Sequence, residues 1–179
     1  MFTFSSCFDE NGLLHYIGTE GRSSAYSNPH TRGHVKASRS SNESGNVYDF
    51  VGRDKVTSYT SSQANSWMKV DLGSTRTLVV DRYCLRYGRN NVQYMLRSWN
   101  LEGSNDDVNW SILRQHNNDT SMAETAYSEG HWDVNSAASN SPYRFFRIVQ
   151  TGKDARGYDN LMCSGMELYG KLRLTAGNF

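Results

Sequence analysis

Hydrophobic and polar residues alternate with a period of two over several short segments of the chain. In residues 67–72, Met68, Val70 and Leu72 share one face, as in a strand that covers a core. Residues 77–87 repeat the pattern. The expected inward face of this second strand is Val79, Tyr83, Leu85 and Tyr87, and the opposite face is Arg82, Cys84 and Arg86.

The following segments predict a hairpin and two more strands. Residues 99–103 place Trp99 and Leu101 on one face, and the Ser-Asn-Asp-Asp sequence at 104–107 is typical of a turn. In the return strand, Val108, Trp110 and Ile112 are expected to share one face. Residues 143–150 are apolar on both faces, which predicts a strand covered on both sides. The last strand alternates Met166, Leu168 and Leu172 with Glu167, Tyr169 and Lys171.

Helical periodicity is nearly absent. Only 121–124, Ser-Met-Ala-Glu, has the capping-box pattern of a helix start, and we expect a turn or two there at most. Long connections at 38–66 and 114–142 are rich in Ser, Asn and Gly. Several short strands with turn signals between them predict one all-β sandwich domain over residues 1–179.

Composition narrows the class of protein. Four Trp, 11 Tyr and 7 Phe are enough to fill a core and argue against disorder. With 19 basic against 18 acidic residues the formal net charge is +1, which excludes nucleic acids and anionic membranes as expected ligands. The chain has no apolar run near the roughly 20 residues of a membrane span, so we expect a soluble protein.

The cysteine count points to a reducing compartment. Cys7, Cys84 and Cys163 are an odd number, so at least one thiol stays unpaired, and the cytoplasm is favoured. Three Asn-x-Ser/Thr sequons, at Asn42, Asn109 and Asn118, favour the alternative of a secreted protein.

Four motifs in order carry a family resemblance. They are WMKVDLG at 67–73, SWNLEGSNDDVNW at 98–110, YRFFRI at 143–148 and MELYG at 166–170. Together they resemble the discoidin or coagulation factor 5/8 type C family. The resemblance implies a galactose-binding-like jelly-roll β-sandwich of about eight main antiparallel strands, with its core motifs at 67–170 and its ligand site on loops at one end.

The N-terminal part is similar to an intracellular branch of this family. Segments 8–18, 28–30 and 49–54, with LMCSG at 161–165, resemble the branch found in BTB and ubiquitin-ligase scaffold proteins. This implies a protein or peptide partner within such a scaffold. Secreted members tie the first strand to the end of the domain with a disulfide. Here no cysteine follows residues 166–170, and a Cys7–Cys163 bridge stays as the alternative to free thiols.

Three connections carry Arg and Tyr, the residues that dominate protein interfaces, at 16–30, 88–97 and 152–160. The candidate ligand-binding residues are Tyr26, His30, Arg89, Tyr94, Arg97, Lys153, Arg156 and Tyr158. For each of them the alternative is ordinary anchoring of a loop.

The expected function is therefore non-catalytic binding. No nucleophile signature or zinc spacing occurs, and Pro29 and Gly33 make His30 and His34 loop residues rather than a helical metal pair. We expect an intracellular protein–protein interaction domain that recognises a peptide or protein surface. The alternative is a carbohydrate-binding module in which Tyr26, His30, Arg89 and Tyr158 contact a sugar.

The resemblance also implies a cation site. Galactose-binding-like modules often hold a structural Ca²⁺ through loop carbonyls and one or two carboxylates. The matching positions are Asp49 and Asp54, with Thr57 and Glu167. The alternative is that Asp49 and Asp54 cap loop turns through their own backbone, with no cofactor.

Overall fold

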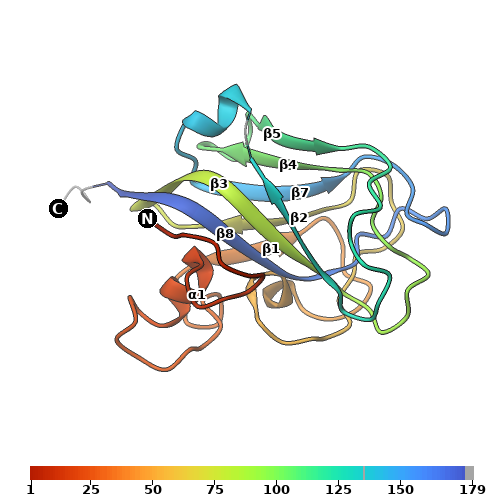
Figure 1. Ribbon diagram of the computed structural model, residues 1–179, viewed down its shortest axis with the longest axis horizontal. Coiled ribbons are helices and arrows are strands. Elements are labelled where there is room, and N and C mark those ends of the chain that lie inside the picture. Colours follow the sequence, from red (N-terminus) through yellow and green to blue (C-terminus); the bar gives the residue numbers. More distant parts are fainter. Residues whose placement is uncertain (135, 176–179) are drawn as a thin grey trace.

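The computed structural model describes residues 1–134 and 136–175, and within them eight antiparallel strands form two sheets (Figure 1). One sheet has the order β1-β2-β7-β4-β5 and the other β6-β3-β8. The strands are β1 Lys36–Arg39, β2 Trp67–Asp71, β3 Arg76–Tyr87, β4 Trp99–Ser104, β5 Ser111–His116, β6 Glu129–Asp133, β7 Phe145–Gln150 and β8 Cys163–Leu174. The all-β sandwich prediction is confirmed.

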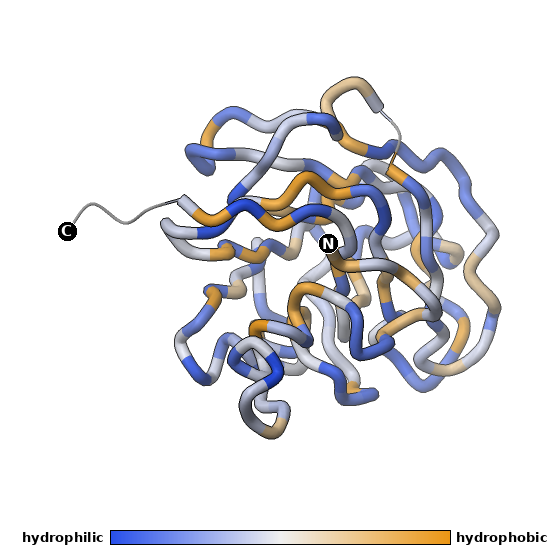
Figure 2. The backbone as a smooth tube through the Cα atoms, turned by 60° about the vertical axis from the view of Figure 1, so that its left-hand side comes forward, coloured by the Kyte–Doolittle hydropathy of each residue, from blue (hydrophilic) through white to orange (hydrophobic). Residues whose placement is uncertain are grey.

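The hydrophobic core lies between the sheets. In β2, Met68 and Val70 are almost fully buried, as the alternating pattern predicts, and Leu72 just beyond the strand is buried with them. Strand β7 lies between β2 and β4 and is buried on both faces along most of its length, also as predicted. Figure 2 shows hydrophobic positions recurring along the strands, while much of the loop chain is hydrophilic.

Strand β3 reverses its inward face part-way along. Leu78 and Val80 are buried in its first half, whereas Tyr83 and Leu85 are buried in its second. A register shift against β8 between Val80 and Arg82 causes the change, because the extra residue of a β-bulge moves later side chains to the other face. The prediction that Val79 faces inward is therefore wrong.

The β4–β5 hairpin has a longer turn than expected. The Asp106 carboxylate oxygen Oδ1 accepts hydrogen bonds from the backbone N–H groups of Val108, at 3.0 Å, and Asn109, at 2.7 Å. This turn delays β5 to residue 111 and leaves Val108 77% and Ile112 50% exposed. The buried residues of β5 are Leu113 and His116, and Val108 and Trp110 precede the strand, so the prediction that Val108, Trp110 and Ile112 share a face of the return strand is wrong.

Helical structure is confined to short pieces, but not at the expected place. They are α1 Leu13–Gly18 and two 3-10 helices, η1 Val47–Val51 and η2 Ala137–Asn140. Residues 121–124 form no helix, because the Ser121 hydroxyl accepts the indole N–H of Trp132 at 3.0 Å instead of capping one. No helix of the described residues is long and apolar enough to cross a membrane.

The N-terminal segment covers the outer face of the β6-β3-β8 sheet. Phe2 exchanges backbone hydrogen bonds with Gly170, and the ring of Phe4 packs 5.2 Å from that of Tyr169. Residues of β8 that alternate outward are consequently buried: Glu167 is 1% and Tyr169 0% exposed. The alternation of Glu167 and Tyr169 with Met166 and Leu168 in the sequence did not predict that the N-terminal segment buries this outer face.

Candidate functional site at the loop end

The sheet order gathers four connections at one end of the sandwich. Antiparallel strands alternate in direction, so the segments 40–66, 88–98, 117–128 and 151–162 all leave the sheets at the same end. In Figure 1 this end lies on the right, opposite the two chain termini. Two of the segments, 88–98 and 151–162, carry most of the residues predicted to bind a ligand.

Side chains from these two loops meet in what we call the aromatic–arginine cluster, which consists of Arg89, Tyr94, Arg156 and Tyr158. The rings of Tyr94 and Tyr158 have their centroids 5.8 Å apart. The guanidinium carbons of Arg89 and Arg156 lie 4.6 Å and 5.6 Å from the centroid of the Tyr94 ring. Such distances allow each cation to be attracted by the ring face. The structure thus brings four of the eight predicted ligand residues together.

The loop 151–162 owes its shape to a buried carboxylate. Asp154 Oδ1 accepts hydrogen bonds from the backbone N–H groups of Arg156, at 2.9 Å, and Tyr158, at 3.0 Å. The N–H of Ala155 donates to the carbonyl of Met95 at 2.9 Å and joins the two loops. Burial raises the pKa of Asp154 above its usual range, although these backbone donors act in the opposite direction.

Apolar residues under the loop 88–98 support the cluster from below. Met95 is fully buried and Leu96 is 5% exposed. Their packing explains why apolar residues occur in a polar connection. Tyr94 is only half-buried, and Tyr158 is 46% exposed, so the aromatic part of the cluster faces solvent.

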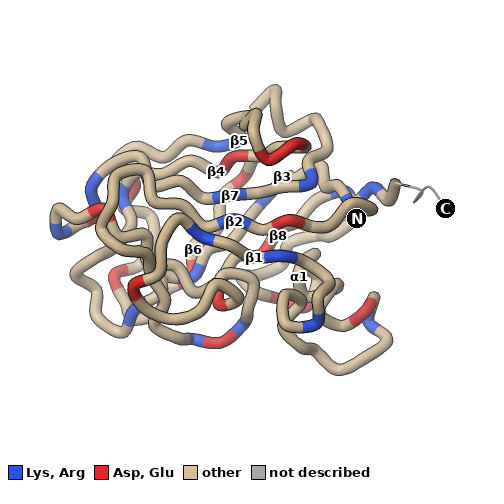
Figure 3. The backbone as a smooth tube through the Cα atoms, turned by 180° about the vertical axis from the view of Figure 1, so that it is seen from behind, with Lys and Arg blue, Asp and Glu red and all other residues tan. Residues whose placement is uncertain are grey.

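The cations at this end differ in how far they are neutralised. Arg97 pairs with Glu124 at 2.6 Å, and Lys153 pairs with Asp159. Arg89 and Arg156 have no ion pair with any carboxylate in residues 1–134 and 136–175. Figure 3 shows basic and acidic positions interspersed at this end. The two arginines of the cluster are therefore available to meet an anionic ligand.

Tyr26 and His30 lie elsewhere. In Figure 1 their segment lies beside α1, away from the loop end. His30 Nδ1 accepts a hydrogen bond from the N–H of Ala37 at 2.9 Å, which gives this histidine an anchoring role. Tyr26 stacks on His15 with centroids 5.5 Å apart, and burial raises its pKa to about 12. The rings of Tyr26 and His15 line a hollow of about 470 Å³, together with Glu10 and Arg22.

Solved structures resemble this architecture at low sequence identity. A fucolectin from the serum of Morone saxatilis matches with a TM-score of 0.60 and 19% identity, over 79% of this chain and 47% of that one. The module CBM32-3 of a family 31 glycoside hydrolase from Clostridium perfringens matches with a TM-score of 0.57 and 16% identity, over 78% of this chain and 92% of that one. This chain has the galactose-binding-like fold.

The sequence is similar to segments of ubiquitin ligases and of a BTB protein, the kinds of protein that its N-terminal motifs resemble. It is 35% identical to the E3 ubiquitin-protein ligase Ufd4 of Drosophila melanogaster over 96% of this chain. It is 36% identical to the ligase hecd-1 of Caenorhabditis elegans over 93%, and 31% identical to a BTB/POZ domain-containing protein of Arabidopsis thaliana over 92%. The chain spans only 6% of each ligase and 21% of the BTB protein. No protein-family model matches it.

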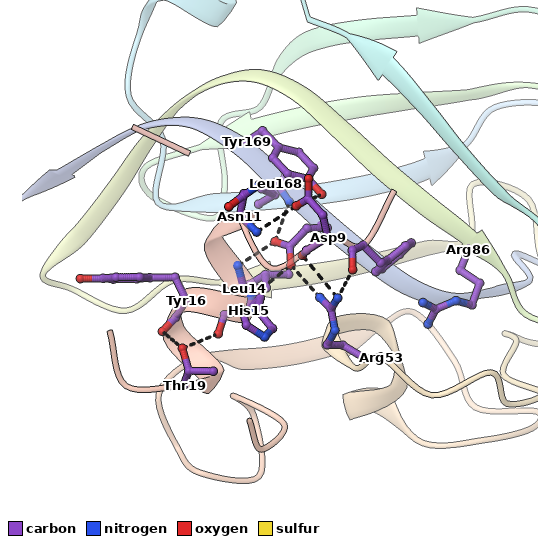
Figure 4. A network of polar contacts seen from close by, with 12 residues as sticks. Asp9, Asn11, Leu14, His15, Tyr16, Thr19, Arg53, Arg86, Leu168 and Tyr169 are labelled. Atoms are coloured by element: carbon purple, nitrogen blue, oxygen red, sulfur yellow. Dashed lines mark hydrogen bonds and ion pairs between the residues drawn. The ribbon is translucent and has the colours of Figure 1, made fainter. Parts of the chain in front are cut away.

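Glu167, the carboxylate that the resemblance implies as a calcium ligand, has other partners, and three of them, Leu14, His15 and Arg53, are labelled in Figure 4. Its oxygens accept the backbone N–H groups of Leu14, at 2.7 Å, and His15, at 3.0 Å, and so cap the N-terminus of α1. The guanidinium of Arg53 lies 3.6 Å from Glu167 and also donates to the carbonyl oxygens of Phe8 and Asp9. The carbonyls of Phe8 and Asp9 and the carboxylate of Glu167 thus surround the Arg53 guanidinium. Because this cation already engages these oxygens, they do not fit a calcium ion in addition.

The other nominated calcium ligands also have partners. Asp49 Oδ2 accepts the N–H of Asn46 at 2.7 Å and forms the capping box of η1, while Asp54 is exposed. The hydroxyl of Thr57 bonds that of Tyr127 at 3.2 Å. In the part of the chain that is described, no three His, Cys, Asp or Glu side chains are grouped to hold a metal ion. Calcium at Asp49 and Asp54 stays a prediction.

Two residues that matter here were missed by reasoning from the sequence. Arg53 was not singled out, although it lies in the segment 49–54 that carries part of the resemblance. Asp154 was seen only as part of a polar loop. An Asp two and four residues before Arg156 and Tyr158 is the spacing at which a carboxylate bonds its own loop, and this signal was available in the sequence.

Proposed function

We propose that this galactose-binding-like domain is a non-catalytic, intracellular protein-interaction module, and that its aromatic–arginine cluster binds an acidic segment of a protein partner. The observation that carries the proposal is the meeting of Arg89 and Arg156, both free of ion pairs with the described carboxylates, at the solvent-facing Tyr94–Tyr158 pair. A guanidinium offers forked donors that match a carboxylate, and tyrosine adds rigid contact area.

The sequence relatives supply the setting for this proposal. Matching segments occur in two ubiquitin ligases and in a BTB protein, as a small part of each. A module of this kind would recruit a protein to such a scaffold, while the chemistry would belong to other parts of the longer protein. We place the module in the cytoplasm, with secretion as the alternative, and the free thiols of Cys7, Cys84 and Cys163 agree with that placement.

The test is binding of the purified chain to an array of Asp- and Glu-rich peptides and to the same peptides with Asn and Gln in their place. We expect binding to the acidic set, weakened at least tenfold by Arg156→Ala and by Tyr158→Ala. Arg173→Ala and Tyr48→Ala are matched controls, because Arg173 and Tyr48 are also exposed but lie outside the cluster. Equal binding to acidic and amide peptides, or equal loss in the controls, would contradict the proposal.

Carbohydrate binding is the second candidate function. It is supported by the 46% exposure of the Tyr158 ring, since an exposed aromatic ring can stack on a sugar face, and by solved lectin and carbohydrate-module structures that share the fold. Because Tyr26 and His30 lie away from the cluster, only Arg89 and Tyr158 of the four residues nominated for a sugar could contact one at the loop end. A glycan array decides between the two: binding to glycans that Tyr158→Ala abolishes, with no binding to acidic peptides, selects the sugar.

A further inference from the structure

Two cysteines far apart in the sequence lie together under the N-terminal segment. Cys84 is in β3, opposite His131 of β6 and Glu167 of β8, and points to the outer face of this sheet. The N-terminal segment crosses that face, and Cys84 is fully buried beneath it. Cys7 belongs to the segment and packs against the same small cluster, which contains Phe8, Cys84 and Tyr169.

Cys84 lies between Arg82 and Arg86 on the outward face of β3, and the segment covers all three. On the N-terminal side of Cys7, the guanidinium carbon of Arg82 lies 4.5 Å from the centroid of the Phe4 ring. The neighbouring contacts hold the segment in place: the guanidinium carbon of Arg86 lies 4.0 Å from the centroid of the Phe8 ring, and the Tyr169 hydroxyl donates to Asp9 at 3.1 Å. The two thiols are therefore kept adjacent by contacts on both sides of Cys7.

The two thiols are chemically unequal. The neighbouring thiol of Cys84, together with the positive charge of Arg86, lowers the pKa of Cys7 against the opposing effects of burial, Glu129 and Asp9. The neighbouring thiol of Cys7 and burial raise the pKa of Cys84. Cys7 is also the one of the pair that solvent reaches, being half-buried. Cys7 is thus the thiol that an external oxidant meets first, and the thiolate is the reactive form.

The third cysteine is placed apart from this pair. Cys163 lies opposite Tyr87, three residues beyond Cys84 along β3, which separates the two by about 10 Å. That distance exceeds what a disulfide spans, and the Cys163 thiol donates instead to the carbonyl of Gly165 at 3.3 Å. Burial raises the pKa of Cys163 to about 11. Cys163 packs in the core between the sheets, whereas Cys7 packs in the small cluster on the outer face, so the Cys7–Cys163 bridge is not formed and Cys163 serves as an internal reference.

We propose that Cys7 and Cys84 are a dithiol that hydrogen peroxide converts reversibly to a disulfide, which staples the N-terminal segment to β3. In the first step the Cys7 thiolate attacks one peroxide oxygen, the O–O bond breaks, and Cys7 becomes a sulfenic acid while hydroxide leaves and takes up a proton as water. In the second step the Cys84 sulfur attacks the sulfur of Cys7, the S–O bond breaks, and the hydroxyl leaves as water with the proton of Cys84. Two thiols are oxidised and one peroxide is reduced to two waters. A small dithiol reverses the reaction by exchange.

The experiment treats the reduced chain with hydrogen peroxide, blocks remaining thiols with N-ethylmaleimide and maps the peptides by mass spectrometry. We expect a Cys7–Cys84 linked peptide lighter by two hydrogens, lost on addition of dithiothreitol, with Cys163 still a thiol. Cys163→Ser is the matched control and should give the same link. Cys7→Ser, at a half-buried position that should tolerate the change, should give no link, and Cys84→Ala should drive Cys7 to sulfinic acid.

A second measurement follows the stapling itself. The oxidised chain should melt several degrees above the reduced chain, because the cross-link restricts the unfolded state, and Cys7→Ser should abolish the difference. The proposal is overturned if the wild-type Cys7 goes to sulfinic acid without linking to Cys84, if the link joins Cys7 to Cys163, or if Cys7 and Cys163 react at the same rate.

Discussion

Replacing Glu167 by Gln tests whether one buried carboxylate joins the last strand to the only α-helix of the described residues. Glu167 is 1% exposed and accepts two backbone N–H groups of α1, those of Leu14 and His15, while facing the Arg53 guanidinium. A glutamine keeps the size and one carbonyl oxygen, but its amide group puts a donor where the second N–H needs an acceptor. One buried N–H is then left unpaired, which costs about 1–3 kcal/mol.

The loss of charge adds to this cost, because the Glu167→Gln change also leaves Arg53 without its carboxylate partner. Taking both effects together, we expect the free energy of unfolding to fall by about 3 kcal/mol. For a chain of 179 residues this corresponds to a Tm lower by about 6–12 °C. Most single substitutions lower the free energy of unfolding by less than this, so the loss in Glu167→Gln should stand out.

Urea unfolding followed by circular dichroism measures the free energy, and amide hydrogen exchange shows where the loss acts. The N–H groups of Leu14 and His15 should exchange faster in Glu167→Gln by more than the global loss of stability accounts for. Glu10→Gln is the matched control, since Glu10 is exposed near the same helix, and should change stability by less than about 0.5 kcal/mol. A loss below 1 kcal/mol in Glu167→Gln, with unchanged exchange at Leu14 and His15, would refute the capping role.

Two further outcomes are expected. Gly170→Ala should destabilise the chain by more than about 3 kcal/mol in urea unfolding, because Gly170 has a φ of +143° and a Cβ there would lie 2.1 Å from the carbonyl oxygen of Val79. Gly157→Ala is the milder comparison. Gly157 has a φ of +91°, but an added Cβ would meet nothing within 4 Å, so the change should cost only about 1 kcal/mol. Because Arg53 already faces Glu167 and two carbonyls, Tm should be equal in calcium and in a chelator, and a rise of several degrees with calcium would show that an ion binds.

Alternation along the chain predicted strands where one face is buried and the neighbours stay in register. Strand β2 is such a case, since Met68 and Val70 point inward as expected. In β3 the same reasoning was right for Tyr83 and Leu85 but wrong for Val79. The bulge that separates these halves depends on Gly170 of a strand far away in the sequence, so no local pattern could reveal it.

The helix α1 and the two ligand loops also differ in how far the sequence predicted them. α1 has no side-chain cap of its own and depends on Glu167, a contact between residues more than 150 positions apart, so local capping signals missed it. The loops at 88–97 and 152–160 were predicted as ligand loops from their Arg and Tyr content, and their meeting follows from the sheet order. Which cations are already paired, such as Arg97 with Glu124, depends on loops that the sequence does not place.

The backbone pairing of Phe2 with Gly170 determines how this domain can be linked to other polypeptide segments. It fixes the first residues beside the last strand, so residue 1 and the end of β8 both lie on the side away from the aromatic–arginine cluster (Figure 1). A polypeptide can then enter and leave the sandwich without passing in front of the cluster. Circular permutation that joins the two ends with a short linker and opens the loop 40–66 should preserve the fold, and fluorophores attached at both ends would lie close enough for efficient energy transfer while the cluster stays accessible.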